Sequence, residues 1–349
     1  MIDRMVYKHT EQTRKDCIEV LKTQGIWWES DITYSVIIYN SFDESYTRPI
    51  ATGSFSGNVI KCVAVTPLFE GSGLAQRIIN YLLEELYDCG FDNIFLFTKP
   101  KKTRFFTELG FHQIAQGGDA VALLEQNPKG LEQFCKNLKQ YAKIPVNDLP
   151  VSTIIMNCNP FTRGHRYIIE QASQSSSMLY VFIVSEDASA FSTGARIELV
   201  RQGTSDLENV VIIEGGDYVI SKNTFPSYFL KSEKIVNRSY AQLDATIFAE
   251  HIAPALNITR RFVGEEPFCP VTADYNNQLQ EILPRYGIEL TIIERLAYEM
   301  RAISASEVRR LFAVGNFDEL TQLVPETTME YLKSEDAVSV RKALKKSLK

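Results

Sequence analysis

The stretch that decides the fold is Met156–Ala172, which reads MNCNPFTRGHRYIIEQA. An apolar run that predicts a strand leads into it, a turn at Asn159-Pro160 follows, and a helix comes next. Thr162 and His165 lie three residues apart at the helix start, and therefore on one face. The first N–H groups of a helix and the helix dipole attract anions. This strand–turn–helix unit therefore predicts a phosphate site.

A purely structural interpretation of the same segment stays open. His165 falls on the apolar stripe of the predicted helix and could be a half-buried core residue, while Thr162 could be a simple helix cap. Gly164 would let another group approach the backbone closely. Asn159 and Phe161 belong to the turn itself, so they join the candidate nucleotide-binding residues.

A second helix start carries groups of the same kind. The segment ISASEVRRLF, residues 303–312, has Ser304 followed three residues later by Glu307, which is the pattern of a capping box. Ser306 and Arg309 are also three residues apart, so a hydroxyl and a permanent cation share one face. Both groups suit phosphate oxygens, and the segment indicates a second set of phosphate ligands.

In the second half of the chain, apolar strands alternate with amphipathic helices. That order predicts a Rossmann-like parallel sheet, in which ligands bind beyond the carboxyl ends of the strands. Gly264 follows one strand and permits close approach. Glu265 or Glu266 could accept a hydrogen bond from a ribose hydroxyl or orient a metal, unless they form a solvated acidic turn. Arg196 is either a further cation near phosphates or a surface arginine. The predicted strands are 151–157, 179–185, 210–214, 259–263 and 290–294.

The first half contains a glycine-rich turn of its own. Residues 59–75, VIKCVAVTPLFEGSGLA, resemble the central Q/R-x-x-G-x-G/A motif of GCN5-related N-acetyltransferases (GNATs), whose turn amides cradle a pyrophosphate. Gly73 and Ala75 match that motif, but Glu70 places a carboxylate where the family has a polar or cationic group. Acetyl-CoA, a pantetheine arm on a partner protein, and a degenerate remnant all stay open as interpretations. The resemblance implies an α+β fold for this half.

TxGH at Thr162–His165 and ISxSxxR at Ile303–Arg309 together resemble the nucleotidyltransferase superfamily with (H/T)xGH and ISxTxxR signatures. In that superfamily the two segments clamp the ATP triphosphate, and AMP is transferred with release of pyrophosphate. The resemblance implies that His165 contacts the transition-state phosphate, and that Thr162, Ser304, Ser306 and Arg309 hold the triphosphate. Mg²⁺ is expected to bridge phosphate oxygens.

One family joins a GNAT-like part to such a nucleotidyltransferase part, and the chain resembles it over nearly its whole length. This is the citrate lyase ligase family, and GGDYVISKNTFPSYFLK, residues 215–231, also carries the resemblance. The resemblance implies that acetate and ATP form acetyl-AMP and pyrophosphate. The acetyl group would then pass to the thiol of a CoA-derived prosthetic group on the citrate lyase acyl carrier subunit.

Length and composition agree with a cytoplasmic two-domain enzyme. The 349 residues predict domains at 1–128 and 149–349, joined by a linker helix at 129–148. A net charge of -6 disfavours a nucleic-acid partner. The 6 cysteines form no CxxC pair, which favours reduced thiols. The polar N-terminus lacks a signal-peptide core, and no run approaches the ~20 apolar residues of a membrane span.

Three rival functions stay open on the sequence. An adenylyltransferase acting on a phosphorylated coenzyme precursor would share the ATP motifs, although it needs no GNAT-like half. An N-acetyltransferase with a nucleotide-sensing second half would consume acetyl-CoA without ATP, and Glu70 counts against it. A carrier-docking scaffold without catalysis would fail to bind ATP.

Overall fold

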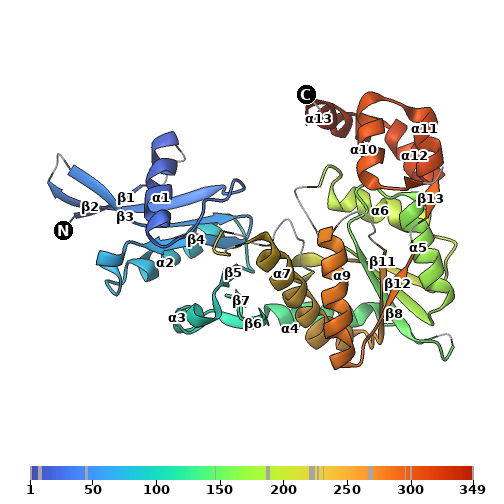
Figure 1. The fold of residues 1–349 in the computed structure, drawn as a ribbon, viewed down its shortest axis with the longest axis horizontal. Helices are drawn as coiled ribbons and strands as arrows, with labels where there is room; N and C mark the ends of the chain where they lie inside the picture. Colours follow the sequence, from blue (N-terminus) through green and yellow to red (C-terminus); the bar gives the residue numbers. More distant parts are fainter. Residues whose placement is uncertain are drawn as a thin grey trace. The chain divides into compact units, whose positions relative to one another are not determined.

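The structure is a computed structural model that describes residues 2–6, 10–43, 46–145, 147–185, 189–219, 225, 228–230, 232–265, 270–294, 296–298 and 301–347. The chain forms two compact units, whose elements are labelled in Figure 1. The first unit comprises Met1–Gln133 and Pro226–Leu243, and the second comprises Phe134–Phe225 and Asp244–Lys349. The boundaries predicted at residues 128 and 148 stay a prediction about where each domain ends.

A mixed sheet forms the first unit. Its strand order is β1-β2-β3-β4-β5-β7-β6, and among the described strands of this sheet only β4 and β5 pair in parallel. The apolar stripe of α2 is buried in the core at Leu74, Ile78, Leu82 and Leu86. The predicted α+β architecture is confirmed. The elements are β1 Ile2–Val6, α1 Glu11–Thr23, β2 Tyr34–Asp43, β3 Tyr46–Ser56, β4 Val59–Val65, α2 Leu74–Asp88, β5 Phe95–Thr98, α3 Thr103–Glu108, β6 His112–Gly117 and β7 Val121–Glu125.

The parallel pair β4–β5 parts soon after it begins. Only Val59 with Phe95 and Ile60 with Leu96 are in register, although β4 continues to Val65. The remaining edges of the two strands therefore face each other without a shared ladder. Two strands that separate in this way leave room for a ligand between them.

Parallel strands form the sheet of the second unit, in the order β10-β9-β8-β11-β12. The chain runs outward from β8 to β10 and then returns beside β8 at β11, so the strand order reverses there. Figure 1 shows α5 and α6 on one side of this sheet and α9 on the other. The predicted parallel-sheet fold is confirmed. The elements are β8 Val151–Met156, α5 Arg163–Gln174, β9 Met178–Ile183, α6 Thr193–Gly203, β10 Val210–Glu214, α7 Glu233–Ile247, α8 Ala253–Ala255, β11 Arg260–Gly264, α9 Pro270–Ile282 and β12 Glu289–Ile293.

A short hairpin and four helices follow the sheet. The helices bury an apolar cluster of their own, in which Val308, Leu311 and Phe312 of α10 pack with Leu320 and Leu332. This packing holds the start of α10 in a defined place. The elements are β13 Ala297–Tyr298, β14 Arg301–Ala302, α10 Ala305–Val314, α11 Phe317–Leu323, α12 Glu326–Lys333 and α13 Val338–Ser347.

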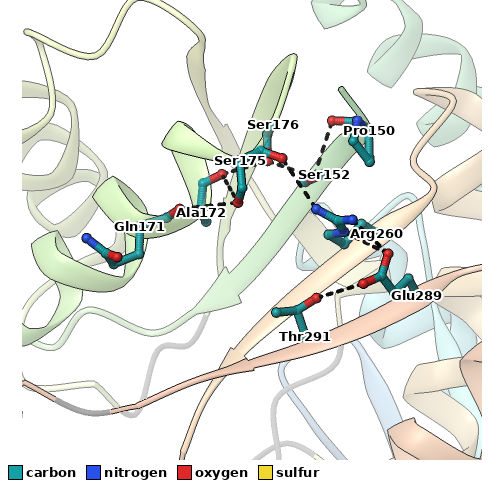
Figure 2. A network of polar contacts seen from close by, with 9 residues as sticks. All are labelled: Pro150, Ser152, Gln171, Ala172, Ser175, Ser176, Arg260, Glu289 and Thr291. Atoms are coloured by element: carbon teal, nitrogen blue, oxygen red, sulfur yellow. Dashed lines mark hydrogen bonds and ion pairs between the residues drawn. The ribbon is translucent and has the colours of Figure 1, made fainter. Parts of the chain in front are cut away.

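The amino ends of the strands are held by polar contacts, drawn in Figure 2. The Arg260 guanidinium donates to the Glu289 carboxylate at 2.8 and 3.0 Å, which joins β11 to β12. The Ser176 hydroxyl donates to Ser152 Oγ at 2.8 Å and so ties the end of α5 to β8. This network lies at the opposite end of the sheet from the rim where ligands of parallel sheets bind.

The observed linker helix is shorter than the helix predicted from the sequence. Helix α4 spans Gly130–Leu138 and a single 3₁₀ turn follows at Lys139–Tyr141, so the expected helix over 129–148 is wrong in its second half. Residues 139–145 are all exposed and give the chain no apolar burial to extend the helix. Among the described residues, no helix combines the length and the apolar character of a membrane span.

Candidate active site

The start of α5 is fixed by a reciprocal cap. Thr162 Oγ1 accepts a hydrogen bond from the His165 N–H at 3.2 Å, and His165 Nδ1 accepts one from the Thr162 N–H at 3.1 Å. His165 thus stands at the position that Glu or Gln takes in an ordinary capping box. Thr162 is buried, so its hydroxyl is taken up by the helix start and by the His165 ring.

The cap also decides which ring nitrogen of His165 carries the proton. Because Nδ1 accepts the Thr162 N–H, a neutral ring has its proton on Nε2. The buried Phe161 ring stacks on the imidazole with centroids 6.1 Å apart and an angle of 13° between the planes. The imidazole is therefore held in orientation by Phe161 and Thr162, which both precede it in the chain.

The start of α10 is built in a similar way. Ser304 caps the helix by accepting a hydrogen bond from the Glu307 N–H at 3.1 Å. The Glu307 carboxylate pairs with Arg310 at 2.6 Å, along the helix. Arg309 donates to Ser306 Oγ at 3.1 Å, and Ser306 is exposed. The hydroxyl and the cation predicted to share a face are therefore in contact.

Two contacts bring the α5 and α10 starts together. A Cβ on Gly164 would lie 3.3 Å from the Ile303 carbonyl oxygen, so the missing side chain permits this close approach. Arg309 also donates to the Asn159 carbonyl oxygen in the loop after β8. Partial burial lowers the pKa of the Arg309 guanidinium, which still remains charged at neutral pH. The two motifs thus meet at the carboxyl end of β8, beside the reversal of strand order.

The loop after β11 lies on the same rim. A Cβ on Gly264 would lie 3.0 Å from Ile168 Cδ1 of α5, so this glycine lets β11 approach that helix. Glu265 is exposed, and its N–H donates to the Ile293 carbonyl at 2.8 Å. Glu266 lies outside the described residues. In the described part of the chain, no group of three His, Cys, Asp or Glu side chains is arranged to hold a metal.

Arg196 is wholly buried, which the sequence did not indicate. The exposed fraction of its side chain is 0%, so Arg196 is neither a surface arginine nor a phosphate ligand open to solvent. Its guanidinium donates to groups at the rim, among them the carbonyls of Asn157, Val184 and Phe191. The spacing of apolar residues in the sequence does not distinguish a buried arginine from an exposed one here, because α6 has weak amphipathic character.

The first unit holds a cavity of about 530 Å³ where β4 and β5 part. Gly73 and Ala75 line it, and Gly73 has φ 81°, a left-handed conformation that favours glycine. Lys99 also lines the cavity. Glu70 is the position that departs from the expected motif. Its carboxylate accepts a hydrogen bond from Gln24 Nε2 at 2.7 Å, which holds it in place.

The aromatic segment 215–231 contributes to this cavity. Tyr228 and Phe229 line it, and the Tyr228 hydroxyl donates to the Phe97 carbonyl of β5 at 3.3 Å. Phe225 is buried, while Pro226 lies outside the described residues. The segment comes from the second half of the sequence but packs in the first unit at Tyr228–Leu230, which local patterns did not reveal.

Comparison with known proteins agrees with both units. The family model of the citrate lyase ligase C-terminal domain matches residues 151–332. The [citrate [pro-3S]-lyase] ligase of Haemophilus influenzae is 40% identical over 329 residues, 93% of this chain and 96% of that protein. The chain belongs to the citrate lyase ligase family. The Klebsiella pneumoniae member is 37% identical over 92% of this chain and 93% of its own, and the Escherichia coli member is 38% identical over 87% and 86%. The resemblance stated from the sequence, and with it the prediction of an enzyme of this family, is confirmed.

Solved structures resemble the chain in parts. Escherichia coli ElaA covers 36% of this citrate lyase ligase family member and 100% of its own chain, with 12% identity and a TM-score of 0.31. Thermotoga maritima TmcAL, solved with alpha-thio ATP, covers 53% of this chain and 55% of its own, with 14% identity and a TM-score of 0.33.

Proposed function

We propose that the chain is an ATP-dependent ligase that activates acetate and acetylates the prosthetic-group thiol of the citrate lyase acyl carrier subunit. The observation that carries the proposal is the meeting of two capped helix starts, with Gly164 against Ile303 and Arg309 on the Asn159 carbonyl. Two N-termini, an imidazole and a guanidinium then converge at the rim, which suits a triphosphate. Membership of the citrate lyase ligase family supports this choice of acceptor.

In the first step, an acetate oxygen attacks the α-phosphorus of ATP. A new O–P bond forms, the bond to the oxygen bridging the α- and β-phosphorus breaks, and pyrophosphate leaves. His165 Nε2–H would donate to a phosphate oxygen as charge develops, while Arg309, Ser304 and Ser306 hold the triphosphate. Thr162 and Phe161 would act by orienting His165, because both side chains are buried. Asn159, Gly164, Gly264 and Glu265 would line the nucleotide.

In the second step, the thiol sulfur of the prosthetic group attacks the acetyl carbonyl carbon. The C–S bond forms, the bond from the carbonyl to AMP breaks, and the thiol proton is released. We place the thiol arm in the cavity of the first unit, on Gly73 and Ala75. Its parted strands offer main-chain groups to the amides of an extended arm.

Mg²⁺ is expected to travel with ATP. Magnesium sites of this kind use one or two carboxylates plus substrate phosphates. On the rim, Glu265 would contact the ion or the ribose. When bound, the ion would offset negative charge on the phosphates.

A cytoplasmic location belongs to the same proposal. Five of the six cysteines lie in the described part of the chain, and these five form no disulfide with one another. Reduced thiols are typical of the cytoplasm. Cys269 lies outside the described residues.

The function is tested by exchange of labelled pyrophosphate into ATP, with Mg²⁺, in the presence and absence of acetate. The proposal expects exchange only with acetate, before any protein partner is added. Exchange that does not depend on acetate but does depend on a phosphorylated coenzyme precursor would establish the adenylyltransferase alternative instead. Acetyl-CoA consumption without ATP would establish the N-acetyltransferase.

The arm site is tested with the same assay and one variant. Ala75→Phe should fill the cavity of the first unit, so transfer of acetate to the carrier thiol should fall while acetate-dependent exchange continues. Loss of both reactions, or of neither, would contradict the proposal that the thiol arm binds in this cavity.

A further inference from the structure

A buried cation organises the rim of the second unit. Arg196 Nε donates to the Phe191 carbonyl at 3.1 Å, and Nη2 donates to Thr193 Oγ1 at 2.8 Å. Its Nη1 donates to the Asn157 carbonyl and the Val184 carbonyl at 2.8 Å, and to Asn157 Oδ1 at 2.7 Å. Burying a guanidinium is costly unless its donors find acceptors, and here each nitrogen has one. The side chain therefore fixes the groups that accept from it.

Most of those acceptors lie on the two loops that leave the centre of the sheet, and Thr193 is the first residue of α6. Asn157 directly follows β8, and Val184 directly follows β9. The Phe191 N–H donates in turn to Asn159 Oδ1 at 3.1 Å, and the Asn159 carbonyl accepts from Arg309. A continuous set of hydrogen bonds thus runs from Arg196, through the loop that carries the α5 cap, to Arg309.

We infer that Arg196 is a positioning residue for the triphosphate site, an inference that rests on the proposed function. Arg196 touches no substrate, because it is wholly buried. It sets the path of the loop between β8 and α5, and thereby the places of His165 and Arg309. An in-line displacement requires accurate positions of the groups that contact the phosphates, and a shift of about 1 Å in such a group costs about a hundredfold in rate.

The chain offers a control at the other end of the sheet. Arg260 also joins two segments of the second unit, through Glu289 and the Ser175 carbonyl, but at the amino ends of the strands. Figure 2 draws these contacts. Arg196→Lys and Arg260→Lys both keep the charge and both remove hydrogen bonds, but they disturb opposite ends of the sheet. Arg260 is partly exposed and Arg196 is wholly buried, so kcat is compared per folded molecule of each variant.

The experiment measures kcat for acetate-dependent exchange at saturating ATP, together with the melting temperature of each variant. Arg196→Lys should remain folded and lose about a hundredfold in kcat per folded molecule, while Arg260→Lys keeps the wild-type kcat. A purely structural arginine would lower the folded fraction and leave that kcat unchanged. Such a result for Arg196→Lys, or an equal loss for Arg260→Lys, overturns the inference.

Two provisions keep the test decisive. If Arg196→Lys does not fold, Asn157→Ala removes one acceptor from the loop and should lower kcat by about tenfold, with an unchanged kcat overturning the inference. If the wild type shows no acetate-dependent exchange, it is the proposed function that fails. ATP titration then becomes the readout, and affinity should fall in Arg196→Lys but not in Arg260→Lys; equal affinities would overturn the inference.

Discussion

His165 contributes to the fold through one ring nitrogen and, on our proposal, to chemistry through the other. Nδ1 completes the helix cap with the Thr162 N–H, while Nε2 carries the proton that would meet a phosphate oxygen. A loss of activity after a single His165 substitution would therefore not distinguish a broken cap from a missing donor. The structure shows how to separate them, because glutamine can fill the same position of a capping box.

His165→Gln should keep the cap and lose the imidazole. We expect acetate-dependent exchange to fall by about 10²–10³-fold, with stability near that of the wild type. His165→Ala should lose the same activity and, in addition, about 1 kcal/mol of unfolding free energy. Exchange kinetics and urea unfolding of both variants measure this. Near-normal exchange in His165→Gln would mean that His165 is a capping residue alone.

At the scale of elements, the site depends on how closely α5 approaches the segment before α10. Gly164 is the residue that permits the approach, since a Cβ there would meet Ile303 at 3.3 Å from its carbonyl oxygen and 3.5 Å from its Cβ. Backbone cannot move aside as a flexible side chain can. A methyl group at this position would therefore increase the distance between the starts of α5 and α10.

Gly164→Ala should separate the two helix starts slightly. We expect exchange to fall by at least about tenfold and the unfolding free energy to fall by about 1 kcal/mol. Gly194→Ala is the matched control, because Gly194 lies in α6 and has no atom within 4 Å of an added Cβ. The control should keep full exchange and gain up to about 1 kcal/mol from helix propensity. Equal exchange in both variants would contradict the role assigned to Gly164.

For the whole molecule, the first unit contains buried thiols that link its stability to pH. Burial raises the pKa of Cys17 from 9.0 to about 11 and that of Cys62 from 9.0 to about 12. Both thiols are neutral in the folded unit, while in the unfolded chain they ionise near pH 9. The folded state therefore binds more protons above pH 9, and its stability falls as pH rises through the window from 9 to about 11 or 12.

Unfolding free energy of the first unit should drop by about 1 kcal/mol per buried thiol between pH 8 and pH 10. Urea unfolding of the wild type and Cys17→Ala at both values measures this. The variant should be less stable at pH 8, where it has lost only packing, and the gap should narrow at pH 10. A gap of constant size would contradict the assigned thiol.

The sequence by itself determined the local chemistry: the strand–turn–helix at Met156–Ala172, the two helix starts, the alternation that builds a parallel sheet, and the family. These follow from spacings of three or four residues and from apolar periodicity, which act over a few neighbours. Only the tertiary structure decided that Gly164 meets Ile303, that Arg196 is buried, and that Tyr228–Leu230 packs in the first unit. It also decided that β4 and β5 part to leave a cavity. Such contacts join residues far apart in the chain, and they form because burial and hydrogen bonding are satisfied over the whole fold, a condition that no local pattern of residues expresses.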